Sequence, residues 1–332
     1  MALLSVYSAQ AMFTGASFTG ADIAQQRTRY TEKRQLALSP DGHTAIIKPT
    51  GVGGMFVNVI DRITKNMQDI PSSKGIATFC LGDAKTAYLA NKEGKIAKYV
   101  KAEHGNWERN LVMDANRCVS CIAVNPTNTL CCAGTTTGKL DILCTRLFSS
   151  EVRLHTETLG AVVAAAWSND GKHIYTGSQH GQSHRLCIWD VQNAIECDGK
   201  NESDVVQSYI LKEPITSLTT DGDYVLTGHK DGMMRIFDVR EKKDALKLKQ
   251  SDQPIIGIYA CGNGRYVYHY NDDEKQESHL GIWDAMGTAC QFGSFKSNDM
   301  SVTYANDGAH QKLVCATDNN ELTDLDVFNY RR

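Results

Sequence analysis

Short apolar segments alternate with polar turns along most of this chain, and the same pattern returns seven times. In each unit an apolar strand runs into a turn rich in Asp, Gly or Asn, and a second and a third strand follow. The turn anchors are Asp41, Asp83, Thr127, Asp170, Asp221, Asn263 and Asp307. Subtracting neighbouring positions gives spacings of 42, 44, 43, 51, 42 and 44 residues.

The ends of the third strands keep the same period. They fall at Asp61, Val100, Cys144, Asp190, Asp238, Asp284 and Asp326. A period of about 40 residues made of strands alone is typical of a β-propeller, in which four-stranded sheets stand radially around an axis. The sequence therefore predicts an all-β, seven-bladed propeller of four-stranded antiparallel blades.

The ends of three of these strands also carry a recurring dipeptide, Trp189-Asp190, Phe237-Asp238 and Trp283-Asp284. Turns such as Ser39-Pro40-Asp41-Gly42 and Ser168-Asn169-Asp170-Gly171 precede strands of this kind. Over residues 34–330 the chain resembles the WD40-repeat family, with degenerate repeats, and the six dipeptide residues would be its structural repeat positions. The resemblance implies the propeller fold and no particular activity, because this architecture serves many unrelated functions.

The predicted third strand of the fifth blade has apolar side chains on both faces. Side chains alternate along a strand, so Met234 and Ile236 share one face while Arg235 and Phe237 share the other. A sheet with two apolar faces has to be covered on both sides. We therefore expect each blade to be packed between two others in a closed ring.

The last blade supplies three predicted strands, near 300–304, 313–317 and 322–328. In the family that the chain resembles, an N-terminal strand completes this blade. We expect Leu3–Phe13 to do so, with Gly20–Gln26 as the competing segment. Residues 1–33 would then be a closing strand and a loop, and residues 34–332 the propeller, all in a single domain.

Charge and composition narrow the function classes. The 332 residues carry a net charge of −3, which gives no general attraction to nucleic acid or anionic lipid. No apolar run approaches the roughly 20 residues of a membrane span, and the first residues lack the basic start of a signal peptide. These features favour a protein without membrane association, located in the cytoplasm, with the nucleus left open.

Eleven cysteines lie mostly within the predicted strands, which favours small buried thiols in a reducing compartment. Cys118-x-x-Cys121 followed by Cys131-Cys132 has the composition of a zinc site. Residues 118–124, however, form a predicted strand, on which positions three apart point to opposite faces. We therefore expect no metal there.

No residue spacing indicates a catalytic site. The segment Gly134–Lys139 has one residue too few between its glycines for a phosphate loop, and no nucleophile elbow is present. His180 and His184 flank a predicted hairpin without a third metal ligand nearby, which favours an exposed polar tip. His155, in the predicted connection that leads to the fourth blade, is a candidate for the structural histidine of the resembled family. The sequence thus predicts a protein that is not an enzyme and holds no metal or cofactor.

One face of the predicted propeller gathers the hairpins between second and third strands and the connections between blades. Charged and imidazole side chains are frequent at these positions. The candidate protein-binding residues are Lys92, Arg117, His180, His184, Arg185, Lys230, Asp231, Asp272, Asp273 and Lys275. Mixed charges without a large apolar patch favour recognition of peptides or loops of other proteins.

Three charged segments have alternative interpretations. Residues 271–279 form a long charged hairpin, which is either a contact arm or a solvated tip. The lysines of 240–249 lie at the predicted outer edge of blade five, where charge prevents pairing between sheets. A further basic cluster lies at 27–34, and RNA binding would become credible if both basic clusters shared one side.

The leading hypothesis is a monomeric, non-catalytic scaffold that holds partner proteins within a hetero-complex. One alternative is a substrate receptor of a cullin-type ubiquitin ligase, because Val225–Arg240, ending in Phe237-Asp238-Val239-Arg240, resembles the adaptor-docking box of the family. The other alternative is a propeller associated with RNA or ribonucleoprotein.

Overall fold

The computed structural model of the protein describes residues 35–49, 55–72, 74–115, 118–146, 149–155, 160–196, 205–261, 264–284, 289–295, 300–306, 311–316 and 322–326. Within them the chain forms seven antiparallel sheets, which we number as blades one to seven in sequence order. Six sheets have four strands, and the seventh has three among the described residues. The predicted all-β, seven-bladed propeller is thus confirmed.

The first four blades each run from an inner to an outer strand in sequence order. Blade one comprises β1 Gln35–Leu38, β2 Thr44–Lys48, β3 Phe56–Asp61 and β4 Met67–Pro71. Blade two comprises β5 Ile76–Asp83, β6 Thr86–Asn91, β7 Lys95–Lys101 and β8 Trp107–Asp114. Blade three comprises β9 Val119–Val124, β10 Leu130–Thr135, β11 Lys139–Cys144 and β12 Ser149–His155. Blade four comprises β13 Ala161–Trp167, β14 His173–His180, β15 Ser183–Asp190 and β16 Val205–Leu211.

The remaining three blades follow the same order. Blade five comprises β17 Ile215–Asp221, β18 Tyr224–His229, β19 Met233–Asp238 and β20 Lys243–Lys249. Blade six comprises β21 Ile255–Ala260, β22 Arg265–Asp272, β23 Glu277–Asp284 and β24 Ala289–Phe295. Blade seven comprises β25 Ser301–Asn306, β26 Gln311–Ala316 and β27 Leu322–Asp326.

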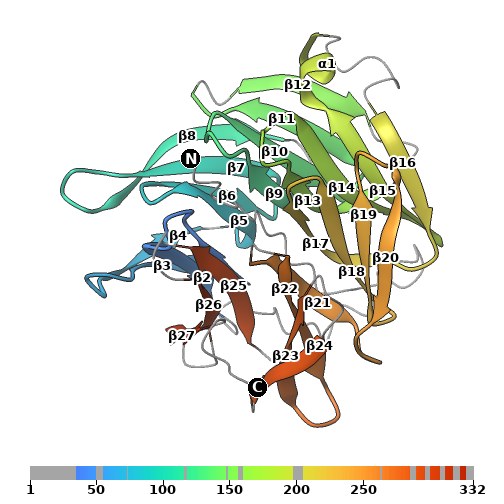
Figure 1. The fold of residues 1–332 in the computed structure, drawn as a ribbon. Coiled ribbons are helices and arrows are strands. Elements are labelled where there is room, and N and C mark those ends of the chain that lie inside the picture. Colours follow the sequence, from blue (N-terminus) through green and yellow to red (C-terminus); the bar gives the residue numbers. More distant parts are fainter. Residues whose placement is uncertain are drawn as a thin grey trace, which may run out of the picture.

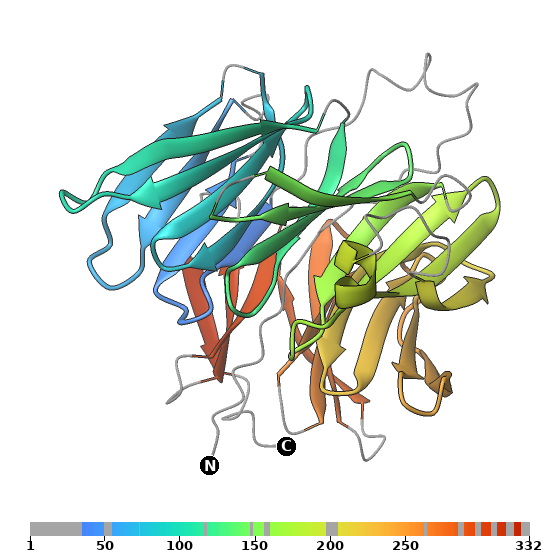
Figure 2. The ribbon, with the colours of Figure 1, turned by 90° about the horizontal axis from the view of Figure 1, so that it is seen from above.

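The blades are arranged in a ring (Figure 1). The innermost strand of each blade contacts the innermost strand of the next, and β25 of blade seven contacts β1 of blade one. In both views the blue strands of blade one lie beside the red strands of blade seven (Figure 1 and Figure 2). Arg62, which follows β3, forms an ion pair of 2.5 Å with Asp324 of β27 across this junction. Blades one and seven are therefore neighbours in the ring.

A separate hydrophobic cluster fills each of the seven junctions between neighbouring blades. Phe237 of β19 shares one cluster with Leu186 and Ile188 of blade four. Met234 lies on the other face of β19 and shares the next cluster with Trp283 of blade six. Both faces of the blade are thus buried, as the alternation predicted, and the hydrophobic core is divided among the seven junctions.

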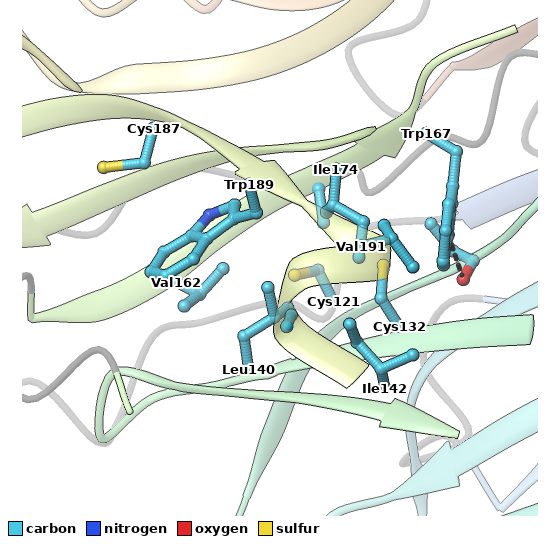
Figure 3. Packing of buried hydrophobic residues seen from close by; sticks show 13 residues of the cluster. Cys121, Cys132, Leu140, Ile142, Val162, Trp167, Ile174, Cys187, Trp189 and Val191 are labelled. Carbon is cyan, nitrogen blue, oxygen red and sulfur yellow. Dashed lines mark hydrogen bonds between the residues drawn. The ribbon is translucent and has the colours of Figure 1, made fainter. Parts of the chain in front are cut away.

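The junction between blades three and four shows how this packing is built (Figure 3). Leu140 and Ile142 of β11 lie in one cluster with Trp189 of blade four. The indole Nε1 of Trp167 donates a hydrogen bond of 3.1 Å to the carbonyl oxygen of Ala123. Apolar contact excludes water from the junction, and the buried indole N–H keeps a hydrogen-bond partner.

Among the described residues one helix interrupts the strands, although the sequence predicted strands alone. Helix α1 Val191–Glu196 directly follows β15, and the backbone N–H of Asn193 donates 3.0 Å to Oδ1 of Asp190. Asp190 is therefore an N-cap of this helix. Because α1 lengthens the connection between β15 and β16, it explains the one long repeat spacing, 51 residues from Asp170 to Asp221.

The strand boundaries agree with the repeat landmarks. Third strands end at Asp61, Cys144, Asp190, Asp238, Asp284 and Asp326 as predicted, and β7 ends one residue after Val100. The placement of His155 in a connection was wrong, because this residue pairs with Lys139 at the end of β12. The following predictions lie outside the described residues: the anchors Asn263 and Asp307, the strand Leu3–Phe13 with its competitor Gly20–Gln26, and the basic cluster at 27–34.

Candidate protein-binding face

The hairpins between second and third strands lie on the same face of the ring as the connections from one blade to the next, because the strands of each blade run alternately up and down. We name this the hairpin face. Its hairpin turns are at 92–94, 136–138, 181–182, 230–232 and 273–276, and the described residues of its connections include 72, 74–75, 115, 118, 212–214 and 250–254. The turns between first and second strands lie on the opposite face.

Backbone hydrogen bonds fix the hairpins to the connections. The N–H of Lys92 donates 3.1 Å to the carbonyl of Gly75, and the N–H of Lys230 donates 3.2 Å to that of Pro214. At Gly232, where φ is 76°, a Cβ atom would lie 1.9 Å from a carbonyl oxygen of the adjoining connection. Only glycine fits there. The exposed side chains of this face therefore project from a backbone that is held in place.

Lys92 lies on the blade-two hairpin and is exposed, as expected for a binding residue. Beside it, Glu93 forms an ion pair of 2.9 Å with Lys74 of the preceding connection. Arg117, expected on the next connection, lies outside the described residues. The part of this region that the structure describes is thus a polar surface with both signs of charge.

His184 of blade four does not lie at an exposed tip, which corrects the expectation for this residue. The hairpin turns over residues 181–182, so His184 already belongs to β15, and it is only 5% exposed. Burial lowers the pKa of His184; Glu213 opposes this effect and Lys230 adds to it. His184 is therefore neutral near pH 7, whereas His180 on the same hairpin is exposed.

Arg185, the next residue along β15, points to the opposite side of the blade from His184 because side chains alternate. It is half-buried, and its Cα pairs with that of Ile210 in the outer strand β16. Two of the three predicted binding residues of this hairpin therefore face different blades.

The buried His229 supports the hairpin of blade five, a role that the sequence did not predict. The Nε2 atom of His229 lies 2.8 Å from Oγ1 of Thr227, and its Nδ1 atom lies 3.3 Å from the carbonyl oxygen of Glu213. Burial is the main cause that lowers the pKa of His229 to about 4. Asp231 accepts a backbone N–H within its own turn at 3.0 Å. Asp231 thus shapes the turn, and the exposed side chain beside it is Lys230.

The blade-six hairpin carries the predicted acidic residues. Oδ1 of Asp272 accepts the backbone N–H groups of Glu274 and Lys275 at 3.2 and 3.1 Å, and Nζ of Lys275 donates 2.8 Å to Oδ2. The hydrogen bond from Lys275 is the main cause that lowers the pKa of Asp272, and the pKa of Lys275 is raised in turn. These two residues satisfy each other, while Asp273 and Glu274 are exposed at the tip.

The aromatic repeat residues lie inside the junctions between blades. Nε1 of Trp189 donates 2.8 Å to Oγ1 of Thr176 on the neighbouring strand. Trp283 stacks on Tyr266 with ring centroids 5.1 Å apart, and Phe237 is fully buried. These three side chains are therefore inaccessible to a partner and hold the sheets together.

The aspartates of the same dipeptides organise the chain that leaves each third strand. Oδ1 of Asp238 accepts the backbone N–H of Glu241 at 2.9 Å, as Asp190 does for helix α1. The side chain of Asp284 lies outside the described residues. The described aspartates thus have the geometry of local caps.

Within the described ranges, no three His, Cys, Asp or Glu side chains are placed to hold a metal ion. Cys118 precedes β9 and is exposed, whereas Cys121 within β9 is fully buried. Of the helices that the structure describes, none is long and apolar enough to span a membrane.

The basic segment 240–249 includes the outer strand of blade five, and most of its cationic side chains contact carboxylates. The ion pairs are Arg240–Asp223 at 2.7 Å, Lys243–Glu241 at 3.3 Å, Lys249–Asp252 at 3.3 Å and Lys247–Asp244. These ion pairs reduce the electrostatic attraction between this segment and the phosphate backbone of a nucleic acid.

Comparison with protein-family models matches the WD domain, G-beta repeat, to residues 149–190 and 206–238. Each match starts in the outer strand of one blade and continues through three strands of the next, from β12 into blade four and from β16 into blade five. The matches end at Asp190 and Asp238, two of the predicted repeat residues. Comparison with curated protein sequences finds no match.

Among solved structures 1646 chains match, so the fold is common and does not select a function. One of them, from "Crystal Structure of Mitotic Checkpoint Complex", covers 95% of this chain and 97% of that chain, with a TM-score of 0.70 and 12% identity. At this identity the likeness shows the fold alone. The chain is therefore a seven-bladed β-propeller in which residues 149–190 and 206–238 match the WD40 repeat.

Proposed function

We propose that the protein is a non-catalytic scaffold subunit of a multiprotein complex, whose hairpin face binds peptides or loops of partner proteins. The observation that carries the proposal is that exposed charges, such as Lys92 and Lys230, project from hairpins whose backbone is tied to the connections between blades. A surface that is already ordered loses little conformational entropy on binding. A chain of the same fold occurs in a structure titled as a complex, which is compatible with this class of function.

A pair of double variants tests this proposal. Lys92→Glu with Lys230→Glu reverses two exposed charges on the hairpin face, and Lys85→Glu with Lys172→Glu does the same at exposed turns of the opposite face. Each protein is used to isolate partners from its native lysate. We expect the first variant to lose partners that the wild type and the second variant retain. Identical partner sets for all three proteins would refute a role for the hairpin face.

A second function, substrate receptor of a cullin-type ubiquitin ligase, is favoured by one specific observation. Arg240, which ends the segment that resembles an adaptor-docking box, is 77% exposed in its side chain and pairs with Asp223 at 2.7 Å on the face opposite the hairpin face. An adaptor could therefore reach it while a substrate occupies the hairpin face. Adaptor binding that Arg240→Ala leaves unchanged, or its absence in the wild type, would remove this candidate.

The proposal also includes a cytoplasmic location and an N-terminal strand that completes blade seven. Free, buried thiols at Cys80, Cys121 and Cys131 support a reducing compartment. Blade seven has three described strands. We assign its fourth strand, beside β27, to Leu3–Phe13 within residues 1–33. Deletion of residues 1–13 should then lower the unfolding temperature.

A further inference from the structure

The outer strand of blade four, β16, presents an apolar surface to solvent. Ile210 is 74% exposed, more than any other large hydrophobic side chain among the described residues, and Val206 is 47% exposed. Ser208 lies between them and is also exposed. No described strand pairs with the outer edge of β16, which therefore offers a row of backbone N–H and C=O groups. The strand lies at the periphery of the ring (Figure 1).

One face of β16 is covered by blade five, and these contacts hold the strand in place. The ring of Tyr209 packs against that of Phe237 in blade five, with centroids 4.9 Å apart. Nε2 of Gln207 donates 3.2 Å to the carbonyl oxygen of Lys242. The residues left for an outside contact are those of the other face, at positions 206, 208 and 210.

Most other outer strands carry charges, which is how proteins usually prevent edge-to-edge pairing. The charged residues are Asp69 in β4, Glu108, Arg109 and Asp114 in β8, Glu151 and Arg153 in β12, and Lys243, Asp244, Lys247 and Lys249 in β20. Strand β24 also lacks charge, but its exposed residue in the described set, Ser294, is polar. Among the outer-strand side chains that the structure describes, an uncharged edge with exposed large apolar side chains is thus found at β16 alone.

We propose that β16 pairs antiparallel with β16 of a second copy of this chain, across a two-fold axis at Ser208. In this register Val206 of each copy lies opposite Ile210 of the other. Cross-strand pairs of β-branched side chains stabilise antiparallel sheets. The exposed apolar positions of β16 are therefore complementary to themselves about this axis.

Neighbouring registers lose this match. An axis at Gln207 would place Val206 opposite Ser208. An axis at Tyr209 would place Val206 opposite Lys212. Of these three registers, only the axis at Ser208 pairs the two exposed apolar side chains with each other. The resulting dimer joins two four-stranded blades edge to edge and leaves both hairpin faces open, so it is independent of the proposed scaffold function.

Sedimentation of the full chain over a range of concentrations tests the dimer with a matched control. Val206→Lys puts a charge into the proposed interface, and Val112→Lys puts the same charge on outer strand β8, where the original valine is 49% exposed. Each substitution occurs twice per dimer, so we expect Val206→Lys to raise the dimer dissociation constant by about tenfold or more. Val112→Lys should behave as the wild type. Ile210→Lys, at the most exposed position, provides a second variant if Val206→Lys folds poorly.

An introduced charge pair tests the register. Ile210→Asp alone should weaken the dimer, and the combination of Ile210→Asp with Val206→Lys should restore it, because position 206 of each copy lies opposite position 210 of the other. A wild-type chain that stays monomeric at all concentrations would overturn the proposal, as would equal effects of Val206→Lys and Val112→Lys or the lack of recovery in the double variant. Capture of a different protein by β16 of a monomeric chain would overturn it as well.

Discussion

The neighbouring outer strands β16 and β20 occupy equivalent places in blades four and five but present opposite surfaces. β16 has no charged residue, whereas β20 has Lys243, Asp244, Lys247 and Lys249. Both pair on their inner side with the third strand of their own blade. The fold thus dictates the inner contacts of an outer strand and leaves its outward side chains free. Those side chains can keep the edge isolated or suit it to a partner.

The largest expected effect distinguishes the face of β16 that packs against blade five from its exposed face. Phe237 is fully buried and packs against Tyr209 of β16. Truncation of a buried Phe leaves a cavity, so we expect Phe237→Ala to lower the free energy of unfolding by about 3–5 kcal/mol. Ile210→Ala, on the exposed face of the same strand, should change it by no more than about 0.5 kcal/mol. Denaturant unfolding measures both. Similar losses of unfolding free energy for the two variants would show that the two faces of β16 do not differ in burial.

A second prediction concerns the pH dependence of the junction beside these strands. Burial keeps the pKa of His229 at about 4, below the ordinary 6.5, so the folded protein favours the neutral ring. As the pH falls below 6.5, the unfolded chain binds this proton first. The stability that His229 contributes is therefore present above pH 6.5 and is lost as the pH falls to about 4, by roughly 3 kcal/mol.

Unfolding free energies between pH 7 and pH 4 measure this loss. His229→Gln should flatten the curve without abolishing it, because the pKa of the buried His184 is lowered too and contributes in the same direction. An unchanged slope in the variant would show that His229 does not control the pH dependence.

The repeat allowed most of the fold to be predicted from the sequence. Spacing located the third strands to within one residue, and the two apolar faces of β19 predicted the packing of Met234 and Phe237 into different junctions. Helix α1 was missed, because only Asp190 as an N-cap and the long spacing of blade four signalled it.

The candidate face was predicted less completely than the fold. The position of a hairpin follows from the repeat, but its length decides which side chains are exposed. The two-residue turn at 181–182 draws His184 into the sheet. The exposure of Ile210 also escaped prediction, because alternation shows only that Ile210 and Tyr209 face opposite ways. Whether a neighbouring blade covers either face depends on contacts distant in sequence.

A third prediction concerns a variant in which β20 loses charge and so becomes more similar to the uncharged β16. Lys243→Val with Lys247→Val removes two exposed charges from the outer strand of blade five. Their ion pairs are exposed to solvent, so the free energy of unfolding should change by less than about 1 kcal/mol. Self-association should increase, since the edge loses its charge protection. Light scattering against concentration measures this, and an unchanged profile would show that charge is not what keeps β20 unpaired.

The smallest expected effect is at the end of the same segment. Arg240→Ala breaks the ion pair with Asp223, in which both side chains are largely exposed. Such pairs contribute about 0–1 kcal/mol, so thermal unfolding should be nearly unchanged. A large loss of stability would assign Arg240 a structural role and would weaken its candidacy as an adaptor contact.

Hydrogen–deuterium exchange at two protein concentrations compares the two outer strands most directly. We predict that backbone amides of β16 exchange more slowly at high concentration, because pairing with a second copy protects its outer edge, while those of β20 do not change. Equal behaviour of the two strands, or no dependence on concentration in β16, would contradict the view that the uncharged edge is an interface and the charged edge is not.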